Sequence, residues 1–168
     1  FAWVDGHADL WHFFYEPELL ASIVSELAKP FEGKGVTKVV GIESKGFILG
    51  GAVAIRLNAG FAAIRKPGGL FPGEKLEVST AKDYRGIYNT LKLQRASLDS
   101  HDKVVLVDDW FEKGSQALGA KKLIKASGAT YLGSSIIVDQ LSDKARNNIG
   151  NVHSIINAHD LGDSRSSL

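Results

Sequence analysis

The chain has 168 residues, of which 44% are hydrophobic and 23% charged, and this predicts a single globular domain, residues 1–168, with a substantial core. A formal net charge of +1 gives no basic surface for nucleic acid, and no apolar run is long enough to span a bilayer. Because cysteine is absent, disulfides, thiolate nucleophiles and cysteine-ligated zinc are excluded, and we expect a cytoplasmic protein without a nucleic-acid or membrane partner.

Helical and extended patterns alternate through the first part of the chain. Leucine, isoleucine and valine recur at helical spacing in residues 18–29, and residues 36–42 are a run typical of a buried strand. A second helix is predicted over residues 47–57 and a second strand over residues 61–64. This alternation predicts an α/β fold with a parallel twisted sheet flanked by helices.

Residues 66–86 combine prolines, glycines and mixed charges without clear periodicity. A loop of this length in a compact domain is usually functional or disordered, and we predict a flexible lid loop. Within it, residues 68–75 have the glycine spacing of a nucleotide-binding P-loop but lack its Gly-Lys-Ser/Thr ending.

The second half of the chain repeats the alternation. Strands are predicted over residues 90–93, 103–107 and 131–138, and a helix over residues 116–126. Residues 160–168 are predicted to form a polar tail.

Two adjacent carboxylates, Asp108 and Asp109, follow the apolar run of residues 104–107. After them, Gly114-Ser115-Gln116 leads into the next predicted helix. Parallel sheets bind ligands at the carboxyl ends of their strands, and a helix N-terminus attracts anions. The pattern therefore indicates a sugar-phosphate site, with a solvated strand end as the alternative.

The histidines do not have the spacing of metal ligands with partner acids, so we predict no structural metal. They are His7, His12, His101, His153 and His159.

Three motifs follow one another along the chain: Gly41-Ile42-Glu43-Ser44-Lys45-Gly46-Phe47, Arg65-Lys66-Pro67-Gly68, and the apolar strand that ends in Asp108-Asp109. In order and approximate spacing they resemble the adenine phosphoribosyltransferase branch of the type I phosphoribosyltransferases. Asp9-Leu10, Phe13-Phe14 and Glu16-Pro17 also resemble the family's segment before its first helix. The resemblance extends from about Asp9 to about Leu141.

This resemblance implies a purine phosphoribosyltransferase, a glycosyltransferase of purine salvage. Such an enzyme transfers the phosphoribosyl group of phosphoribosyl pyrophosphate (PRPP) to a base nitrogen, releasing pyrophosphate and forming a nucleoside 5′-monophosphate. The resemblance also implies the type I phosphoribosyltransferase fold with a small hood, a homodimer, and Mg²⁺ as cofactor. The ion would bind through the pyrophosphate oxygens, and Asp108 is the one protein side chain that is a candidate ligand for it.

By resemblance, Asp108 and Asp109 would bind the ribose hydroxyls, and Arg65 would clamp the pyrophosphate. The turn that binds pyrophosphate through backbone N–H groups would comprise Ser44, Lys45 and Gly46. The loop that cradles the 5′-phosphate would comprise Glu112, Lys113, Gly114, Ser115 and Gln116.

The lid ends in Asp83-Tyr84-Arg85-Gly86, where the family has Glu-Tyr-Gly. The resemblance makes Asp83 the candidate acid-base for the ring proton, and Tyr84 a group that reaches the substrates on closure. With Arg65, these are the predicted catalytic residues. A solvated hairpin arm is the alternative for this segment.

Two departures from the family concern the substrate. The phosphate loop has Glu112 and Lys113 where the family has Ala-Thr. Lys113 can supply positive charge in place of the lost hydroxyl. Glu112 either contacts the base, pairs with Lys113, or repels the phosphate. Gln140 stands where the family has a leucine that packs on adenine, and His7 lies in a changed segment before Asp9. We predict His7, Phe47 and Gln140 as base contacts and leave the base open.

Three functions remain at this point. The first is phosphoribosyl transfer to a purine, the second is a non-catalytic sensor of PRPP or a nucleotide, and the third is phosphoribosyl transfer to a non-purine acceptor. Turnover with a purine, binding without turnover, or turnover only with other acceptors would distinguish them.

Overall fold

The computed structural model describes residues 2–4, 7–80 and 90–161. In chain order its elements are β1 (Ala2–Val4), β2 (His7–Asp9), η1 (Trp11–Phe14), α1 (Pro17–Ala28), η2 (Lys29–Phe31), β3 (Lys38–Ile42), α2 (Lys45–Arg56), β4 (Gly60–Arg65), β5 (Lys75–Ser79), β6 (Thr90–Gln94), η3 (Arg95–Ser97), β7 (Lys103–Phe111), α3 (Ser115–Ala126), β8 (Thr130–Asp139), α4 (Asp143–Ile149), β9 (Val152–Asn157) and η4 (Ala158–Leu161).

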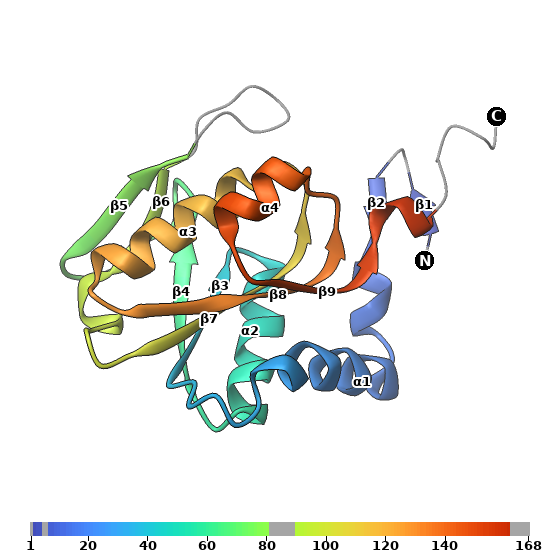
Figure 1. Ribbon diagram of the computed structural model, residues 1–168, viewed down its shortest axis with the longest axis horizontal. Helices are drawn as coiled ribbons and strands as arrows, with labels where there is room; N and C mark the ends of the chain where they lie inside the picture. Colours follow the sequence, from blue (N-terminus) through green and yellow to red (C-terminus); the bar gives the residue numbers. More distant parts are fainter. Residues whose placement is uncertain (1, 5–6, 81–89, 162–168) are drawn as a thin grey trace.

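A seven-stranded sheet in the order β5-β6-β4-β3-β7-β8-β9 forms the centre of the molecule (Figure 1). Strands β4, β3, β7, β8 and β9 run parallel, while β6 pairs antiparallel with both β4 and β5. The predicted α/β sheet flanked by helices is confirmed, with an antiparallel strand toward one edge.

Helices cover both faces of the sheet and enclose two hydrophobic clusters. One cluster lies beneath α3 and α4, and the other lies beneath α1 and α2. Residues 104–107 of β7 are fully buried because both faces of this central strand are covered. This burial explains why the segment reads as a continuous apolar run.

The helices predicted from periodicity occur within one or two residues of their expected bounds. Strand β7 is longer than predicted, because it continues through Asp108 and Asp109 to Phe111 and pairs with β8 along this extension. The two carboxylates therefore belong to an ordered strand. Helix α4 and strand β9 were not predicted, since their sequences carry many polar residues.

The prediction of an uninterrupted loop over residues 66–86 is wrong for residues 75–79, which form β5. Leu76 and Val78 alternate with polar residues and pack against the core, which is the pattern of a half-buried edge strand. Flanking glycines and prolines hid this short alternation. Residues 81–89 and 162–168, which include the last six residues of the predicted lid and most of the predicted tail, lie outside the described residues.

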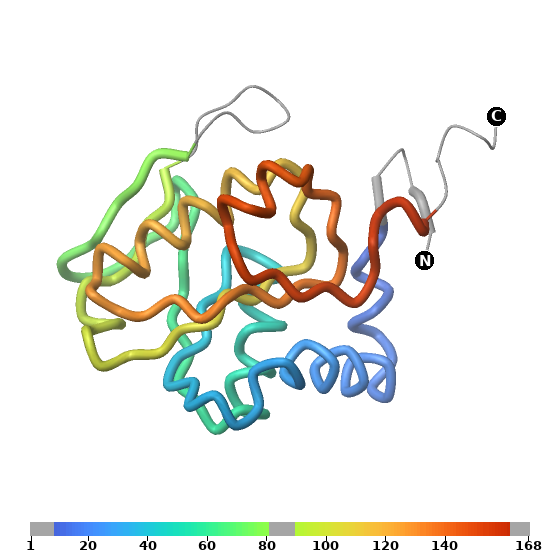
Figure 2. The backbone as a smooth tube through the Cα atoms, in the orientation of Figure 1, coloured from blue at the N-terminus to red at the C-terminus, as the bar shows by residue number. Residues whose placement is uncertain are grey.

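The two ends of the described chain meet one edge of the fold. Figure 2 shows β9 and η4, in red, beside the blue segment that contains η1 and α1, and α1 contacts β9. The hairpin of β1 and β2 forms a separate two-stranded antiparallel sheet at this edge (Figure 1).

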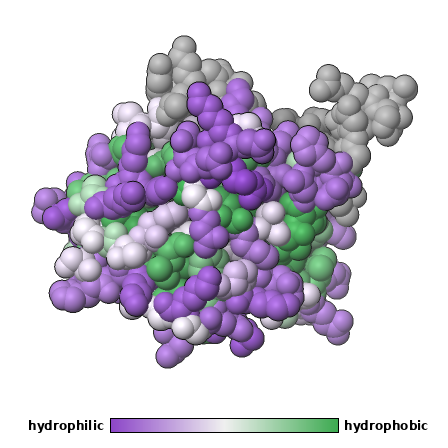
Figure 3. All heavy atoms as spheres, viewed as in Figure 1, coloured by the Kyte–Doolittle hydropathy of each residue, from purple (hydrophilic) through white to green (hydrophobic). Residues whose placement is uncertain are grey.

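The face shown in Figure 3 is covered mainly by hydrophilic side chains, with apolar surface in small separate patches. Among the described residues, no helix is long and apolar enough to cross a membrane.

Candidate active site

Two glycines let the start of α2 lie directly against the ends of β3 and β7. A Cβ on Gly46 would lie 3.0 Å from Oδ1 of Asp108 and 3.2 Å from the carbonyl oxygen of Val107. A Cβ on Gly41 would lie 2.0 Å from the carbonyl oxygen of Gly46. The Glu43–Ser44 peptide bond in this turn is cis. The structure therefore brings the predicted pyrophosphate turn next to the predicted ribose carboxylates.

Asp108 and Asp109 are adjacent in sequence but have different surroundings. Asp108 is 8% exposed, and its Oδ1 accepts a 2.9 Å hydrogen bond from the backbone N–H of Asp109. Burial raises the pKa of Asp108 well above its usual value, and the nearby Asp109 carboxylate raises it further. Asp109 instead forms an ion pair, with 2.9 Å between its Oδ2 and Nζ of Lys45.

Lys45 joins three parts of the site. Its ammonium group contacts Asp109 of β7 and also lies 5.3 Å from the centre of the Trp11 ring in η1. This distance is within the range of a cation–π interaction. Trp11 is 43% exposed, so an aromatic face borders the site beside Lys45 and Asp109.

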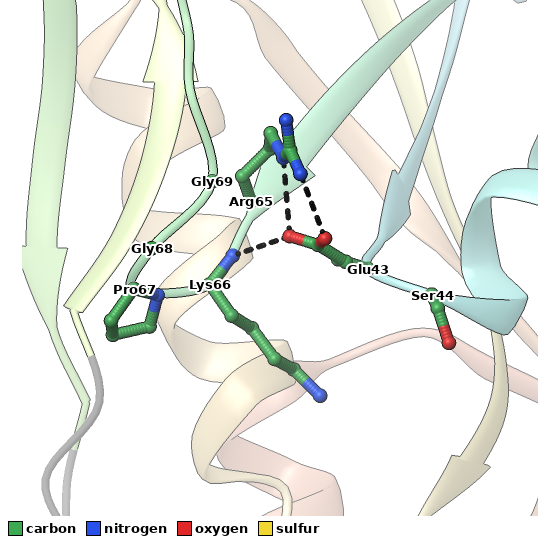
Figure 4. Close-up of a pocket in the computed structure, with 7 residues that line it drawn as sticks. All are labelled: Glu43, Ser44, Arg65, Lys66, Pro67, Gly68 and Gly69. Carbon is green, nitrogen blue, oxygen red and sulfur yellow. Dashed lines mark hydrogen bonds and ion pairs between the residues drawn. The ribbon is translucent and has the colours of Figure 1, made fainter.

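A cleft of about 540 Å³ lies at the ends of β3 and β4. Its lining residues are Glu43, Ser44, Arg65, Lys66, Pro67, Gly68 and Gly69 (Figure 4). Arg65 Nη2 and Nε donate to the two carboxylate oxygens of Glu43 at 2.9 and 3.2 Å. Arg65 Nη1 donates to the carbonyl oxygen of Leu70 at 3.0 Å. Arg65 and Ser44, both predicted to bind pyrophosphate, therefore border one cleft.

The Glu43–Arg65 pair keeps both groups charged. The hydrogen bonds from Arg65 are the largest cause of the lowered pKa of Glu43, and the backbone N–H of Lys66 lowers it further. The hydrogen bonds to Glu43 in turn raise the pKa of Arg65. At neutral pH the cleft therefore contains a carboxylate and a guanidinium.

The loop between β7 and α3 ends at Gly114, which has φ +75°, the left-handed conformation that favours glycine. A Cβ there would also lie 2.8 Å from Cδ1 of Ile149 and 2.9 Å from Cδ2 of Leu141. Helix α3 begins at Ser115, and Gly114 has no side chain to occupy the first N–H groups. These donors remain suited to an anion.

The side chains of this loop differ in exposure. Glu112 and Lys113 are exposed, whereas Ser115 and Gln116 are half-buried in the first turn of α3.

The predicted base contacts have separate partners. Trp110 Nε1 donates to Oε1 of Gln140 at 3.0 Å. The ring of Phe47 instead packs edge-on against Phe61 of β4, with 6.0 Å between ring centres. The structure therefore places Gln140 beside β7 and engages Phe47 in packing α2 on the sheet.

Three further predicted residues are not tested by these contacts. His7 belongs to β2 and pairs with Val4, but its side chain is not described. Asp83 and Tyr84 lie outside the described residues.

No family model matches the chain. Over 131 residues it is 40% identical to an adenine phosphoribosyltransferase of Phocaeicola vulgatus, and the alignment covers 78% of this chain and 74% of that protein. The chain belongs to the adenine phosphoribosyltransferase family. The family resemblance predicted from the three sequence motifs is therefore confirmed.

Solved structures of the family have the same fold. The adenine phosphoribosyltransferase of Rhodothermus marinus has a TM-score of 0.80 and 32% identity, over 89% of this chain and 85% of that one. The Giardia lamblia enzyme, solved with 9-deazaadenine, also has a TM-score of 0.80 and 32% identity, over 90% of this chain and 86% of that one.

Sequence reasoning missed three residues that shape the site: Glu43, Trp11 and Trp110. The sequence motif of residues 41–47 contains Glu43 but predicts no role for it. Glu43 is the first residue after β3, and Arg65 is the last residue of the neighbouring strand β4. Register between these neighbouring strands would have predicted their contact, since Ile42 lies beside Ile64. The tryptophans gave no such signal, because their positions depend on packing between η1, β7 and the turn after β8.

Proposed function

We propose that this protein transfers the phosphoribosyl group of PRPP to a purine base, releasing pyrophosphate and forming a nucleoside 5′-monophosphate. The observation that carries the proposal is that two anion-binding elements flank the Asp108–Asp109 strand end. The start of α2 lies on one side, and the start of α3 follows β7 directly. The names of the relatives support adenine as the acceptor.

In this proposal, the pyrophosphate of PRPP binds in the cleft beside Arg65. The backbone N–H groups of Ser44, Lys45 and Gly46 lie at the start of α2, where the helix dipole favours an anion. Arg65 adds a planar donor group suited to phosphate oxygens. These groups would stabilise the negative charge that develops on the leaving pyrophosphate.

The ribose would lie over the end of β7. Asp109 would accept hydrogen bonds from ribose hydroxyls after Lys45 turns from it toward the pyrophosphate. Asp108, which is buried behind it, would hold the strand end in place through its hydrogen bond from the Asp109 N–H. A carboxylate beside the ribose would also stabilise positive charge at the reacting carbon.

The 5′-phosphate would bind the N–H groups at the start of α3, with Lys113 supplying charge in place of the family's hydroxyl. The position of the loop supports this assignment, because Gly114 directs the chain from β7 straight into the helix.

The donor set fits Mg²⁺ bound mainly through the substrate. Among the described residues, no group of three acidic or histidine side chains converges on one point. Asp109 offers carboxylate oxygens, the ligands that Mg²⁺ prefers, at the edge of the site, whereas Asp108 is buried behind it. When bound to the pyrophosphate oxygens, the ion would neutralise part of the leaving group's charge.

The family resemblance supplies the remaining parts of the proposal. Asp83 would exchange the ring proton of the base, Tyr84 would reach the substrates, and Gln140 would lie beside the base. A cytoplasmic homodimer is also part of this proposal on the same grounds.

The test is product formation from PRPP, Mg²⁺ and one base at a time: adenine, hypoxanthine, guanine and xanthine. Chromatography would detect the nucleotide, and an Asp108→Asn, Asp109→Asn variant serves as the inactive control. We expect a nucleoside monophosphate with adenine and none with the control. Binding of PRPP without product from any base would refute transfer to these purines and support a sensor or a non-purine acceptor.

A further inference from the structure

The ion pair between Glu43 and Arg65 continues the register of two neighbouring parallel strands. Ile42 of β3 lies beside Ile64 of β4, and the N–H of Glu43 donates to the carbonyl oxygen of Ile64 at 3.0 Å. The next residues along, Glu43 and Arg65, therefore meet at the strand ends. Figure 4 shows the Glu43 carboxylate directed at the Arg65 guanidinium, with Lys66 on its other side.

Glu43 holds both the side chain of Arg65 and the main chain that follows it. Its Oε2 accepts from Arg65 Nε at 3.2 Å and also from the backbone N–H of Lys66 at 3.2 Å. Its Oε1 accepts from Arg65 Nη2 at 2.9 Å. One carboxylate thus fixes the guanidinium and the first residue of the segment that lines the cleft.

The charge of Glu43 is opposite to the one that an anion site needs. A carboxylate in the cleft repels pyrophosphate, so its charge alone weakens binding. The position of the Glu43 carboxylate favours anion binding, because the carboxylate holds the Arg65 guanidinium by its Nε–Nη2 edge. The carbonyl oxygen of Leu70 accepts from Nη1 of the same guanidinium. An arginine has one further N–H group on each of Nη1 and Nη2, and these three hydrogen bonds do not use them.

We propose that Glu43 is a positioning residue that presents the outer nitrogens of Arg65 to the pyrophosphate of PRPP. The proposal rests on the proposed function, since it assigns pyrophosphate to this cleft. A guanidinium fixed before binding loses less side-chain freedom on binding, and this gain exceeds the repulsion from the carboxylate.

The two effects of Glu43 predict opposite results for Glu43→Gln. If Glu43 contributed only charge, the neutral amide would strengthen binding of pyrophosphate. Because glutamine offers an NH₂ group where Arg65 needs an acceptor, we expect binding of Mg²⁺-pyrophosphate to weaken by at least about ten-fold, the size of a lost charged hydrogen bond. The KM for PRPP should rise similarly, while the KM for the base stays within about two-fold.

A double-mutant cycle separates positioning from a general structural effect. In an Arg65→Met background, Glu43→Gln should no longer weaken pyrophosphate binding, and loss of the carboxylate's repulsion should leave it equal or slightly tighter. The matched control is Glu32→Gln, which removes an exposed 2.9 Å pair with Arg56 at the far end of α2. It should leave pyrophosphate affinity unchanged. Glu43→Asp keeps the charge, but its side chain is one methylene shorter and does not reach Arg65 from the same position, so it should weaken binding even if Glu43→Gln does not fold.

Calorimetric titration of pyrophosphate measures these affinities without turnover. Unchanged or tighter binding in Glu43→Gln, wild-type binding in Glu43→Asp, or an equal loss in both Arg65 backgrounds would overturn the inference. If wild-type protein bound neither pyrophosphate nor PRPP, the proposed function itself would fail, so the two failures are distinguishable.

Discussion

Single residues at the end of β7 show how position determines the chemistry of identical side chains. Asp108 is buried beneath the turn that starts α2, whereas Asp109 contacts Lys45. Burial disfavours the charged form of a carboxyl group, and the second carboxylate adds to this cost. Asp108 therefore lowers the stability of the unliganded protein at neutral pH, as functional groups often do.

Asp108→Asn should stabilise the fold. The pKa of Asp108 is raised in the folded protein, so its stability cost is absent below the unfolded-state pKa of about 4 and grows as the pH rises above it. We expect the melting temperature of the variant to exceed that of wild type at pH 7.

Melting curves of wild type and Asp108→Asn from pH 3.5 to 8 measure this effect. The two curves should converge at the acidic end and separate toward neutral pH. A constant difference in melting temperature across this range would show that Asp108 is not the titrating group responsible.

Gln140 is the residue most suited to testing base preference. The indole N–H of Trp110 only donates, so it fixes the Gln140 amide with its oxygen toward Trp110 and its NH₂ group directed elsewhere. A leucine would replace this donor with the apolar side chain that the family has here.

Gln140→Leu should shift the ratio of kcat/KM values toward adenine, relative to hypoxanthine, by about ten-fold, the size of one hydrogen bond to a base. Competition between the two bases in one reaction measures this ratio. Trp110→Phe removes the group that orients Gln140 and should shift the ratio in the same direction by less. An unchanged ratio in both variants would exclude Gln140 as a base contact.

At the scale of elements, the closeness of α2 to β7 depends on Gly46. A methyl group there meets the Asp108 carboxylate at 3.0 Å and the Val107 backbone at 3.2 Å, so the turn must shift. Gly46→Ala should cost about 1–3 kcal/mol of stability and most of the activity. Gly51, in the same helix, is the matched control, because a Cβ there meets nothing within 4 Å.

Gly51→Ala should be neutral or stabilising by up to about 1 kcal/mol, because alanine favours the helix. Chemical denaturation and initial rates of both variants test the pair. Equal effects of the two substitutions would mean that the loss reflects the helix as a whole and not the contact with β7.

Most elements of the central sheet could be predicted because burial imposes periodicity. The β7 run and the helix α3 are examples, since covered strands are continuously apolar and α3 has one apolar face. The edge strand β5 was hidden by its short alternation, and α4 and β9 by their polar residues. The resemblance identified Arg65 and Lys45, but only the structure shows that Glu43 and Asp109 pair with them.

At the scale of the whole molecule, α2 and α3 pack on opposite faces of the sheet, and both helices start at the same edge of it. In the proposed function, a ligand with two phosphate-bearing ends and a ribose between them binds along this edge. PRPP with Mg²⁺ should therefore stabilise the protein more than pyrophosphate or ribose 5-phosphate alone.

At one common concentration equal to 100 times the Kd of PRPP, linkage gives about 2.7 kcal/mol for PRPP, or about 5–10 °C in melting temperature, and less for the more weakly bound ligands. Thermal shift assays with the three ligands measure the difference. Equal shifts with PRPP and pyrophosphate would mean that the loop of residues 112–116 does not contribute to binding.

The most direct test of the account is ³¹P nuclear magnetic resonance of PRPP mixed with the protein and Mg²⁺, followed by addition of adenine. The account predicts that the 5′-phosphate and pyrophosphate resonances both change on binding, and that adenine converts them to those of adenosine monophosphate and free pyrophosphate. Unchanged resonances, or adenine-independent hydrolysis alone, would contradict it.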